Sequence, residues 1–385
     1  MKLRIQIFIF TVIRVVTNVA TRMAYPFLGV FARGLGVDVT TLSLVVSSRS
    51  FVAIFIPFVT SIFDRRGRKF GMMVGIGVFS AVSGLVILRP SLVTLSVALI
   101  VGLVGKYVFD TAMQAYLGDR IPYERRGLAL SITETAWSIA FIGGIPLVGF
   151  LISKYGWSAP FPALSILGLV SLAAIWWFVA PDDARHTSSE GPWANIRTVL
   201  THRTTLIAIS ICMFASAANE MVNLIFGVWL EDKFALKIAA LGAASAVIGL
   251  SELGGEGLVA MLTDRLGKTR AIMAGLIASA LATVALPFLG TTQAGALVGL
   301  FFFYIAFEFV IVSHIPMMTE MLPSARVAVM SFNMAGHSTG RLVGSLLAAF
   351  VYKSFGFGMI TSISLGLNVL ALGALFLLQK TRSAR

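Results

Sequence analysis

Ionisable side chains lie inside stretches of this sequence that are otherwise almost wholly apolar. Glu220 and Glu308 each occupy the middle of such a stretch, and so do Arg22 and Lys106. A charge at the centre of a bilayer costs about 2.5–3.5 kcal/mol even on the lenient insertion scale. We therefore expect these side chains to face a cavity or one another, where a buried carboxylate can carry a proton and a buried base can hold an anion.

Two further pairs of ionisable residues are spaced one helical turn apart. Lys106 and Asp110 would share one face of a helix, which predicts an ion pair that a transport cycle could break. Glu252 and Glu256 carry like charges, and close, partly desolvated carboxylates disfavour full ionisation, so one of them could hold a proton near neutral pH. The alternative is that Glu256 simply pairs with a base such as Arg341 or Arg270.

Other polar residues complete the predicted interior. Tyr25, Asn223 and Tyr304 could add hydrogen bonds and aromatic surface to the same cavity. Arg14 and Glu134 lie nearer one end of their apolar stretches, which indicates a gate or an interhelical pair. Histidine spacing suggests no metal site, and the single cysteine excludes an intrachain disulfide and a cysteine zinc cluster. We expect no cofactor.

Composition identifies the elements that must position these side chains. Of the 385 residues, 57% are hydrophobic and 12% are charged, about half the charge of a soluble domain. Apolar runs of about 18 residues or more recur along the chain, each long enough to cross a bilayer. Because every backbone group must be satisfied internally in lipid, these runs are expected to be helices. The predicted fold class is therefore all-α and integral to a membrane.

Twelve transmembrane helices are predicted, in two halves of six. A polar central stretch separates the halves, so the predicted domains are an N-terminal half at 1–180, a cytoplasmic loop at 181–203 and a C-terminal half at 204–385. The approximate spans are 5–31, 41–62, 70–88, 91–117, 127–152, 159–180, 204–230, 238–262, 270–288, 292–319, 327–352 and 357–379.

The distribution of Lys and Arg predicts the orientation of the chain. Most of the thirty basic residues fall on the side that holds both termini and the central loop. Basic residues concentrate on the cytoplasmic side of membrane proteins, so both termini are predicted to be cytoplasmic. The opposite side holds Arg33, Arg89, Lys154, Lys233, Lys237 and Lys353.

The two halves also resemble each other in sequence. Asp64, Arg65 and Gly67 recur as Asp264, Arg265 and Gly267, at a constant offset of 200 residues. Lys154–Trp157 and Ser354–Phe357 keep the same offset, and both segments contain a central glycine. Internal repeats of this size are typical of transporters, so the halves are predicted to be pseudo-symmetric.

Twelve spans, a cytoplasmic central loop and a charged loop after spans 2 and 8 together resemble the major facilitator superfamily. The sharpest match is the family's Gly-x-x-x-Asp-Arg-x-Gly-Arg-Arg/Lys loop, which Asp64, Arg65, Gly67, Arg68 and Lys69 fit. Thr60 and Ala260 replace the leading glycine in the two copies. The resemblance covers the whole chain and implies two six-helix halves that rock around a central path.

The resemblance also implies a gate at the charged loop. Gly67 would permit the tight turn of a very short loop, and Asp64 would face a helix N-terminus or an arginine, holding the outward-open state. Its candidate partners are Arg120 and Arg126. The alternative is that these charges only set the orientation of the chain.

The predicted function is secondary active transport by alternating access in the cytoplasmic (inner) membrane. Gly143–Gly149 resembles a degraded Gly-Pro motif of proton-linked exporters, so proton-coupled antiport, the efflux of a small amphipathic compound by a monomer, is the first interpretation. The alternatives are proton-coupled uptake of an organic anion held by Arg22 and Lys106, flipping of a lipid-like substrate, or a transport-inactive receptor or membrane enzyme on the same fold.

Several classes are disfavoured by what the sequence contains. The net charge of +13 is not arranged as a basic stripe with interleaved aromatic residues, so nucleic acid is not an expected partner. The sequence has no Gly-x-x-x-x-Gly-Lys-Ser/Thr loop that would bind ATP. It also has no metal-ligand spacing, so an enzyme is not expected. The predicted partners are a small-molecule substrate, protons and the lipid bilayer.

Overall fold

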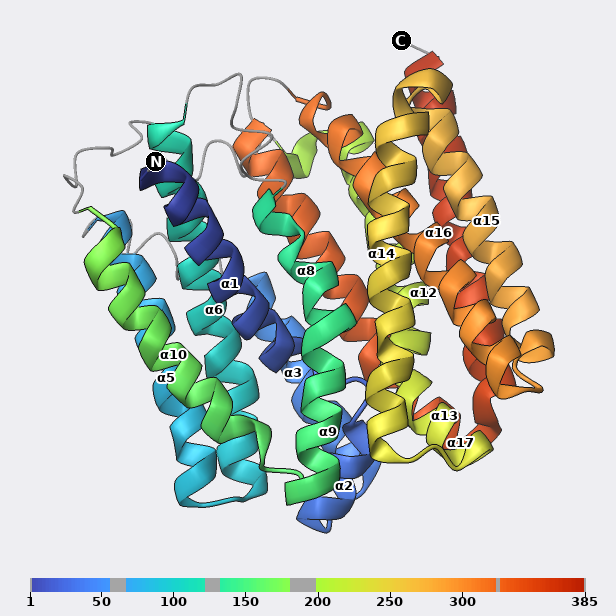
Figure 1. Cartoon of the computed structure of the whole chain (residues 1–385). Coiled ribbons are helices and arrows are strands. Elements are labelled where there is room, and N and C mark those ends of the chain that lie inside the picture. Colours follow the sequence, from blue (N-terminus) through green and yellow to red (C-terminus); the bar gives the residue numbers. More distant parts are fainter. Residues whose placement is uncertain (1, 56–66, 122–131, 181–198, 323–325, 384–385) are drawn as a thin grey trace. The chain divides into compact units, whose positions relative to one another are not determined.

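A computed structural model describes residues 2–55, 67–121, 132–180, 199–322 and 326–383 of the chain. Within these ranges the secondary structure is helical (Figure 1). The elements are α1 (Lys2–Arg22), α2 (Leu28–Leu35), α3 (Val39–Ile54), α5 (Arg68–Leu88), α6 (Leu92–Arg120), α8 (Ala136–Ile139), the π-helical turn η1 (Ala140–Gly144), α9 (Ile145–Tyr155), α10 (Pro160–Phe178), α12 (Arg203–Asn223), α13 (Phe226–Phe234), α14 (Ile238–Leu266), α15 (Lys268–Leu289), α16 (Gln293–Thr319) and α17 (Arg326–Ser383).

These helices account for the predicted spans. Among the described residues, 10 helices are long and apolar enough to cross a membrane, or up to 11 with the bent pair α2 and α3. The helix α17 contains two spans, because Gly356 breaks it with a non-helical backbone (φ 77°, ψ −176°). The twelve-helix architecture is therefore present, all-α as predicted.

The chain divides into two compact units. Unit 1 consists of residues 1–187 and 237–249, and unit 2 of residues 188–236 and 250–385, so that α14 contributes to both. In unit 1, α5 packs between α6 and α10, and α1 packs against α6, α8, η1 and α10 (Figure 1). In unit 2, α12 packs along α17, and α15 packs against α16 and α17.

Each unit has its own apolar core. In unit 1, Phe10, Met72 and Phe109 are fully buried together with their neighbours on α1, α5 and α6. In unit 2, Ile211 and Ile272 occupy the corresponding interior. Side chains of this size contribute about 1.5–3 kcal/mol each when they are removed from water, but in lipid the gain comes from close packing instead.

The first helix of unit 1 is broken, which corrects the continuous span predicted at 5–31, whereas the span predicted at 204–230 is present as Arg203–Phe234 with a turn at 224–225. The helix α1 ends at Arg22 and α2 begins at Leu28. Pro26 explains this break, because proline lacks an N–H and disfavours a helical conformation in the residue before it. In unit 2, α12 ends at Asn223 and α13 begins at Phe226, without a proline to mark the turn.

Glycines at equivalent positions of the two units adopt nearly the same backbone conformation. Gly67 has φ 95° and ψ 152°, and Gly267 has φ 82° and ψ 142°. Gly156 and Gly356 also have positive φ, at 91° and 77°. Residues with a Cβ rarely occupy this region, so the repeated glycines are required by the turns that they form. Helix starts are repeated too, because Ser91 caps α6 and Thr292 caps α16.

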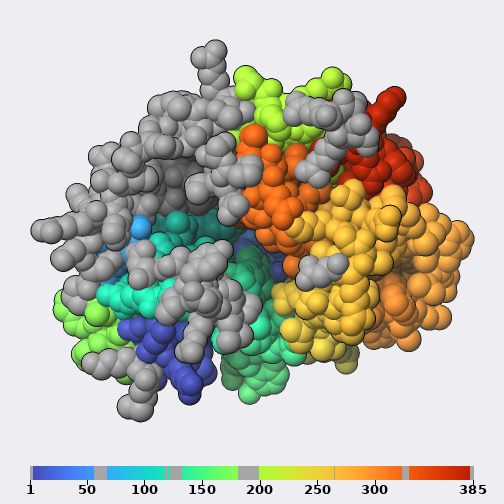
Figure 2. Space-filling view, turned by 90° about the horizontal axis from the view of Figure 1, so that it is seen from above, coloured from blue at the N-terminus to red at the C-terminus, as the bar shows by residue number. Residues whose placement is uncertain are grey.

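The predicted charged loop of the second half is shorter than expected. Asp264 and Arg265 belong to the last turn of α14, and Gly267 alone separates α14 from α15. These two helices meet at the end of unit 2 that is seen in Figure 2. In the first half, Asp64 and Arg65 lie outside the described residues, whereas Gly67 caps α5 and Arg68 begins it.

Candidate functional site

Unit 1 contains a buried ion network centred on Arg14 of α1. The Arg14 guanidinium donates two hydrogen bonds to the Glu134 carboxylate, at 2.6 and 2.9 Å. Its Nε lies 3.3 Å from Asp110 Oδ1, and Nη1 also donates to Thr133 Oγ1. Only 2% of the Arg14 side chain is exposed. The interhelical pair expected between Arg14 and Glu134 is present, and its bidentate geometry is the strong form of such a contact.

Lys106 enters the same network from one turn earlier on α6. Its Nζ donates to Asp110 Oδ2 over 2.5 Å, with 1% of the lysine side chain and 9% of the aspartate side chain exposed. The ion pair expected from the spacing of these residues is thus formed. Asp110 is shared between two bases. The charges of Arg14 and Lys106 are therefore balanced by one buried carboxylate, Asp110, and by the half-buried Glu134.

An aromatic residue connects Lys106 to Arg22. Trp137 of α8 lies 4.6 Å from Lys106 Nζ and 4.5 Å from the guanidinium carbon of Arg22, measured to the ring centroid. Arg22 also lies 4.3 Å from the ring centroid of Phe141, one turn further along. Cations attract the electron-rich faces of aromatic rings. We name Arg22, Lys106, Trp137 and Phe141 the Trp137 cluster.

One predicted cavity residue of unit 1, Tyr25, has a different setting. Tyr25 is buried in the break after α1, and the Arg49 guanidinium lies 5.8 Å from its ring centroid. Arg49 also donates a hydrogen bond to the Thr21 carbonyl over 2.9 Å. Tyr25 and Arg49 therefore pack at the broken end of the first helix.

Unit 2 contains a second network, centred on Glu220 of α12. Glu220 Oε2 accepts hydrogen bonds from Asn223 Nδ2 and from Arg341 Nε, both over 3.1 Å. Tyr304 of α16 donates to Asn223 Oδ1 over 2.9 Å. The network thus joins α12, α16 and α17, and it unites three of the residues predicted from sequence. We name Glu220, Asn223, Tyr304 and Arg341 the Glu220 network.

The Glu220 network is less fully satisfied than the Arg14 network. Glu220 is 1% exposed, yet its Oε1 makes no hydrogen bond with any described residue. The same holds for Asn219 Nδ2 on the adjacent position of α12. Arg341 keeps 29% of its side chain exposed. One turn before Arg341, His337 shares a 2.7 Å hydrogen bond with Ser216, so a polar face runs along the contact between α12 and α17.

The remaining predicted carboxylates lie on α14 and α16. Glu252 is buried, and Glu256 and Glu308 are partly buried. A Cβ on Gly255 would lie 2.7 Å from the Glu308 Cβ, so α14 approaches α16 closely at this point. Arg341, which the sequence offered as a partner of Glu256, binds Glu220, and these two residues lie on the facing sides of α17 and α12.

The predicted gating residues are only partly visible. Arg126, like Asp64 and Arg65, lies outside the described residues, and the side chain of Asp264 is also not described. Arg120 is exposed at the end of α6, where its guanidinium stacks on the Tyr116 ring at 3.8 Å. The gate thus remains a prediction.

Sequence reasoning missed three residues of these sites. Trp137 was not singled out, because nothing in a single sequence tells which aromatic residue of an apolar span meets two cations. Asn18 was also missed; it is fully buried, and both of its side-chain amide atoms lack a hydrogen-bond partner among the described residues. A useful signal existed, since Asn18 lies one turn before Arg22. Arg341 was noticed only as an alternative partner for Glu256.

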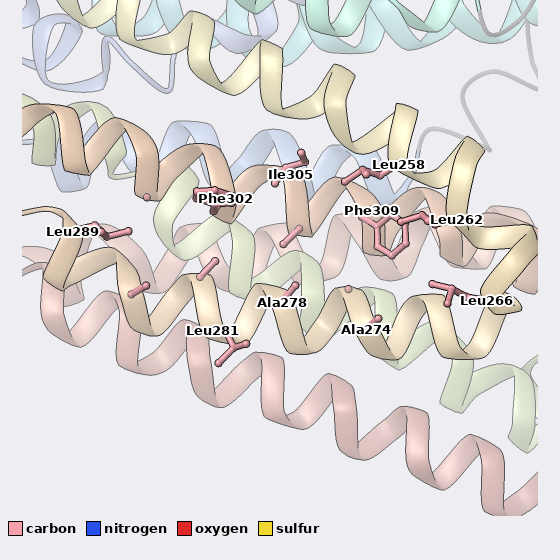
Figure 3. A pocket seen from close by; sticks show the side chains of 15 residues that line it. Leu258, Leu262, Leu266, Ala274, Ala278, Leu281, Leu289, Phe302, Ile305 and Phe309 are labelled. Carbon is pink, nitrogen blue, oxygen red and sulfur yellow. The ribbon is translucent and has the colours of Figure 1, made fainter.

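Unit 2 also contains an apolar groove that is lined by none of the residues of the Glu220 network. It encloses about 490 Å³ between α14, α15 and α16 (Figure 3). All of its lining side chains are apolar; they include Leu258, Leu281, Phe302 and Phe309. Leu281 is 66% exposed and Phe302 is 54% exposed, so the groove opens at the surface of unit 2.

A difference between the repeats explains the groove. In unit 1, a Cβ on Gly75 would lie 2.5 Å from the Gly105 carbonyl oxygen, so α5 and α6 touch backbone to backbone. The equivalent Gly275 of α15 faces the side chains of Phe309 and Val310 instead. Neither Ile305 nor Ala306, which lie 200 and 201 residues after Gly105, is a glycine, and larger side chains keep helices apart.

Comparison with known proteins agrees with this architecture. The sequence profile of the Major Facilitator Superfamily matches residues 10–312 and 209–385. The chain therefore belongs to this superfamily, and it is a multi-pass membrane transporter of the secondary type. The membrane-enzyme alternative is excluded by this membership, because the relatives are transporters.

Individual relatives are distant. The MFS-type transporter YceJ of Bacillus subtilis is 26% identical over 246 residues, which span 62% of this chain and 61% of that protein. The multidrug resistance protein MdtG of Dickeya zeae is 24% identical over 358 residues, 89% of this chain and 86% of its own length. A bacterial homologue of the human lysosomal transporter Spinster, solved facing inward and unoccupied, shares the fold with a TM-score of 0.84 at 13% identity, over 98% of this chain and 97% of its own.

Proposed function

We propose that this protein is a proton-coupled antiporter that exports a small amphipathic organic compound. The protein would act as a monomer in the cytoplasmic membrane, with both termini in the cytoplasm. Its two units would alternate access to a central path, as the repeat architecture of such transporters allows. The similarity to a protein named for multidrug resistance supports export.

The observation that carries this proposal is the state of the Glu220 carboxylate. One oxygen is bound by Arg341 and Asn223, and the other is buried without a hydrogen-bond partner among the described residues. A buried carboxylate must be neutralised either by a base or by a proton. Arg341 and a proton therefore compete for Glu220.

This competition supplies a coupling mechanism. When Glu220 takes a proton, its attraction for Arg341 is lost, and the contact between α12 and α17 weakens. Arg341 would then be available to a substrate or to water, since 29% of its side chain is already exposed. Asn223 and Tyr304 would link the event to α16. Glu308, Glu252 and Glu256 are the further proposed members of the proton path in unit 2.

The proposal also assigns roles in unit 1 and at the cytoplasmic loops. Arg22, Lys106 and Asp110 would line the substrate path, with Tyr25 beside it. The charged segments around Gly67 and Gly267 would gate it, as the resemblance of the motif implies. The exposed Arg120 supports a role at that end of α6.

A transport assay in everted membrane vesicles tests the function. Everted vesicles are energised to an acid interior, and lipophilic cations, organic acids, sugars and lysolipids are added in turn. Export by antiport predicts collapse of the pH gradient and accumulation of one class inside the vesicles. Glu220→Gln should abolish both, because the amide cannot exchange a proton. Glu320→Gln is the matched control, since Glu320 is 61% exposed in a pair with Lys268 at the protein surface.

Three outcomes would contradict the proposal. Coupled transport in Glu220→Gln at the wild-type rate would remove Glu220 from the proton path. Bound substrate without movement of substrate or protons, in protein shown to be folded, would instead favour a receptor. Accumulation driven in right-side-out vesicles by an acid exterior would favour uptake, for which the bases of the Trp137 cluster provide a specific argument.

A further inference from the structure

The apolar groove between α14, α15 and α16 is long enough to receive one lipid chain. It runs from Leu266 at one end to Leu289 at the other (Figure 3). Its lining on α15 extends from Ala274 to Leu289, a length of about 22 Å at a rise of about 1.5 Å per residue. One leaflet of a bilayer contributes about 15 Å of hydrocarbon, half of the core. The groove is thus at least as long as the chain region of one leaflet.

Two arginines continue the lining at the Leu266 end of the groove. Arg265 lies three residues after Leu262 on α14, and Arg270 lies four residues before Ala274 on α15. Residues three or four apart share a helix face, so both arginines belong to the faces that line the groove. Both residues are exposed, and neither forms a hydrogen bond or an ion pair with a described residue. They are therefore accessible to a ligand that enters from the bilayer.

The distribution of charge gives the groove a direction. Lys268, which lies between the two arginines in the sequence, is already held in an ion pair with Glu320 at the surface. At the Leu289 end, residues 290–299 cover the turn between α15 and α16 and the start of α16, and they contain no charged residue. An amphipathic ligand with a negative head would therefore place its head beside Arg265 and Arg270, with its chain directed toward Leu289.

The corresponding part of unit 1 differs in both features. A Cβ on Gly75 would lie 2.5 Å from the Gly105 carbonyl oxygen, so α5 and α6 touch backbone to backbone where α15 and α16 leave the groove. The residue 200 positions before Arg270 is Phe70. The open space and this arginine thus occur together in unit 2, which is expected if one ligand uses both.

We propose that the groove binds an anionic phospholipid, with one acyl chain along α15 and the phosphate between Arg265 and Arg270. The forked guanidinium groups match phosphate oxygens, and arginine stems pack along apolar surface while their heads reach the polar layer. Phe302 and Phe309 contact the chain from α16. In the proposed orientation this end of unit 2 lies at the cytoplasmic leaflet, where basic pockets between helices bind anionic head groups. The site depends neither on the exported compound nor on proton coupling.

Three ligands separate this proposal from its alternatives. They are palmitoyl-oleoyl-phosphatidylglycerol, the phosphatidylcholine with the same chains, and glycerol 3-phosphate. Each is titrated into the purified, delipidated full-length protein in detergent, and native mass spectrometry gives the affinity of the first bound molecule. We expect phosphatidylglycerol to bind at least about tenfold more tightly than phosphatidylcholine, because each basic residue near an anionic head contributes about fivefold. Glycerol 3-phosphate should not compete at equal concentration, because it has no chain for the groove.

Two results with these ligands would overturn the proposal. Equal affinities of the two lipids would mean that only their chains are recognised. Competition by glycerol 3-phosphate at equal concentration would mean that a soluble phosphate is bound without the groove.

Arginine variants test the head-group contact. Arg265→Gln and Arg270→Gln should each weaken phosphatidylglycerol binding about fivefold and leave phosphatidylcholine binding unchanged. Arg270→Lys should recover part of the loss, because it restores the charge without the forked geometry. Arg203→Gln is the matched control, since Arg203 is an exposed arginine of unit 2 at the start of α12, a helix that does not line the groove. Wild-type affinity for phosphatidylglycerol in the double glutamine variant would overturn the proposal.

A further variant tests the groove itself. Ala278 is exposed and lines the groove, so Ala278→Phe fills the space and keeps every charge. It should weaken both lipids about tenfold, as overpacking of an occupied site implies, whereas Ala81→Phe at an exposed position of α5 should weaken neither. Unchanged phosphatidylglycerol binding in Ala278→Phe would overturn the proposal. A dimer that Ala278→Phe dissociates would identify a second copy of the chain as the occupant, and would overturn it too.

Discussion

The two units share a scaffold but differ in the charges that it buries. Both use a positive-φ glycine before the helix that follows the charged segment, at Gly67 and Gly267, and both interrupt their first helix near its end. Unit 1 then places excess base around Trp137, whereas unit 2 places its charge on carboxylates, with Glu220 held by Arg341. The repeat thus keeps its backbone geometry where a positive φ favours glycine, whereas the interior side chains of the two units differ.

The largest expected difference concerns the buried acid of each unit. Asp110→Asn should lower the free energy of unfolding by about 3–5 kcal/mol, because it leaves buried Lys106 without its carboxylate. Glu220→Gln should cost less, about 1–2 kcal/mol, because Arg341 can turn toward its exposed side. Thermal unfolding of both variants in detergent gives the comparison. Equal losses would mean that the Glu220 network is as structural as the Arg14 network.

A second comparison concerns the glycines that bring helices together. Gly75→Ala should destabilise unit 1 by about 1–3 kcal/mol, because the new Cβ meets the backbone of α6 and cannot be relieved by a rotamer change. Gly275→Ala should cost less than Gly75→Ala, since the new Cβ meets side-chain atoms of Phe309 and Val310 first and Phe309 can move into the open groove that it lines. The same unfolding assay ranks the two variants. A larger loss for Gly275→Ala would mean that the groove is more tightly packed than its lining indicates.

For the turn glycines Gly67 and Gly267, we expect the two units to lose the same amount of stability. Gly67→Ala and Gly267→Ala should each cost about 1–3 kcal/mol, since both positions need a backbone region that only glycine occupies readily. Matched unfolding midpoints for the two variants would support an equal structural role. Gly77→Ala provides a control, because a Cβ there meets nothing within 4 Å.

The smallest expected change in stability comes from substitutions at the residues that end α2 and α13. Gly36 ends α2 with φ 67°, whereas Ala235 ends α13 with φ 49°. A left-handed alanine costs about 1–2 kcal/mol relative to its usual conformation. Ala235→Gly should therefore raise stability by up to about 1 kcal/mol, and Gly36→Ala should lower it by a similar amount. Unfolding of the single variants and of the double variant measures both shifts; a loss in Ala235→Gly would contradict this interpretation.

Part of this structure could be predicted from the sequence. The offset of 200 residues identified Gly67 and Gly267, and spacing identified the pair of Lys106 and Asp110, because both depend on local backbone geometry. The pairing of Glu220 with Arg341 joins residues 121 positions apart, and no pattern within either helix specifies which faces meet.

The features that the sequence analysis missed depend on local breaks in helix geometry. Pro26 could have marked the break after α1, but the turn after Asn223 carries no such signal. The π-helical turn from Ala140 to Gly144 lies just before Pro146. A turn of this kind shifts the helix register by a residue, which decides which aromatic side chains face α1. Sequence periodicity assumes a regular helix, so it could not place Trp137 between Arg22 and Lys106.

The apolar groove between α14, α15 and α16 affects how unit 2 is stabilised in a bilayer. A space of about 490 Å³ lined almost wholly by carbon is a poor site for ordered water, since water needs polar partners. In a bilayer the material that enters it is the hydrocarbon of lipid tails, which then contributes the dispersion contacts that Gly75 and Gly105 provide in unit 1. The surrounding lipid thus completes the packing of α15 on α16, and the order and length of its chains become part of what holds this unit together.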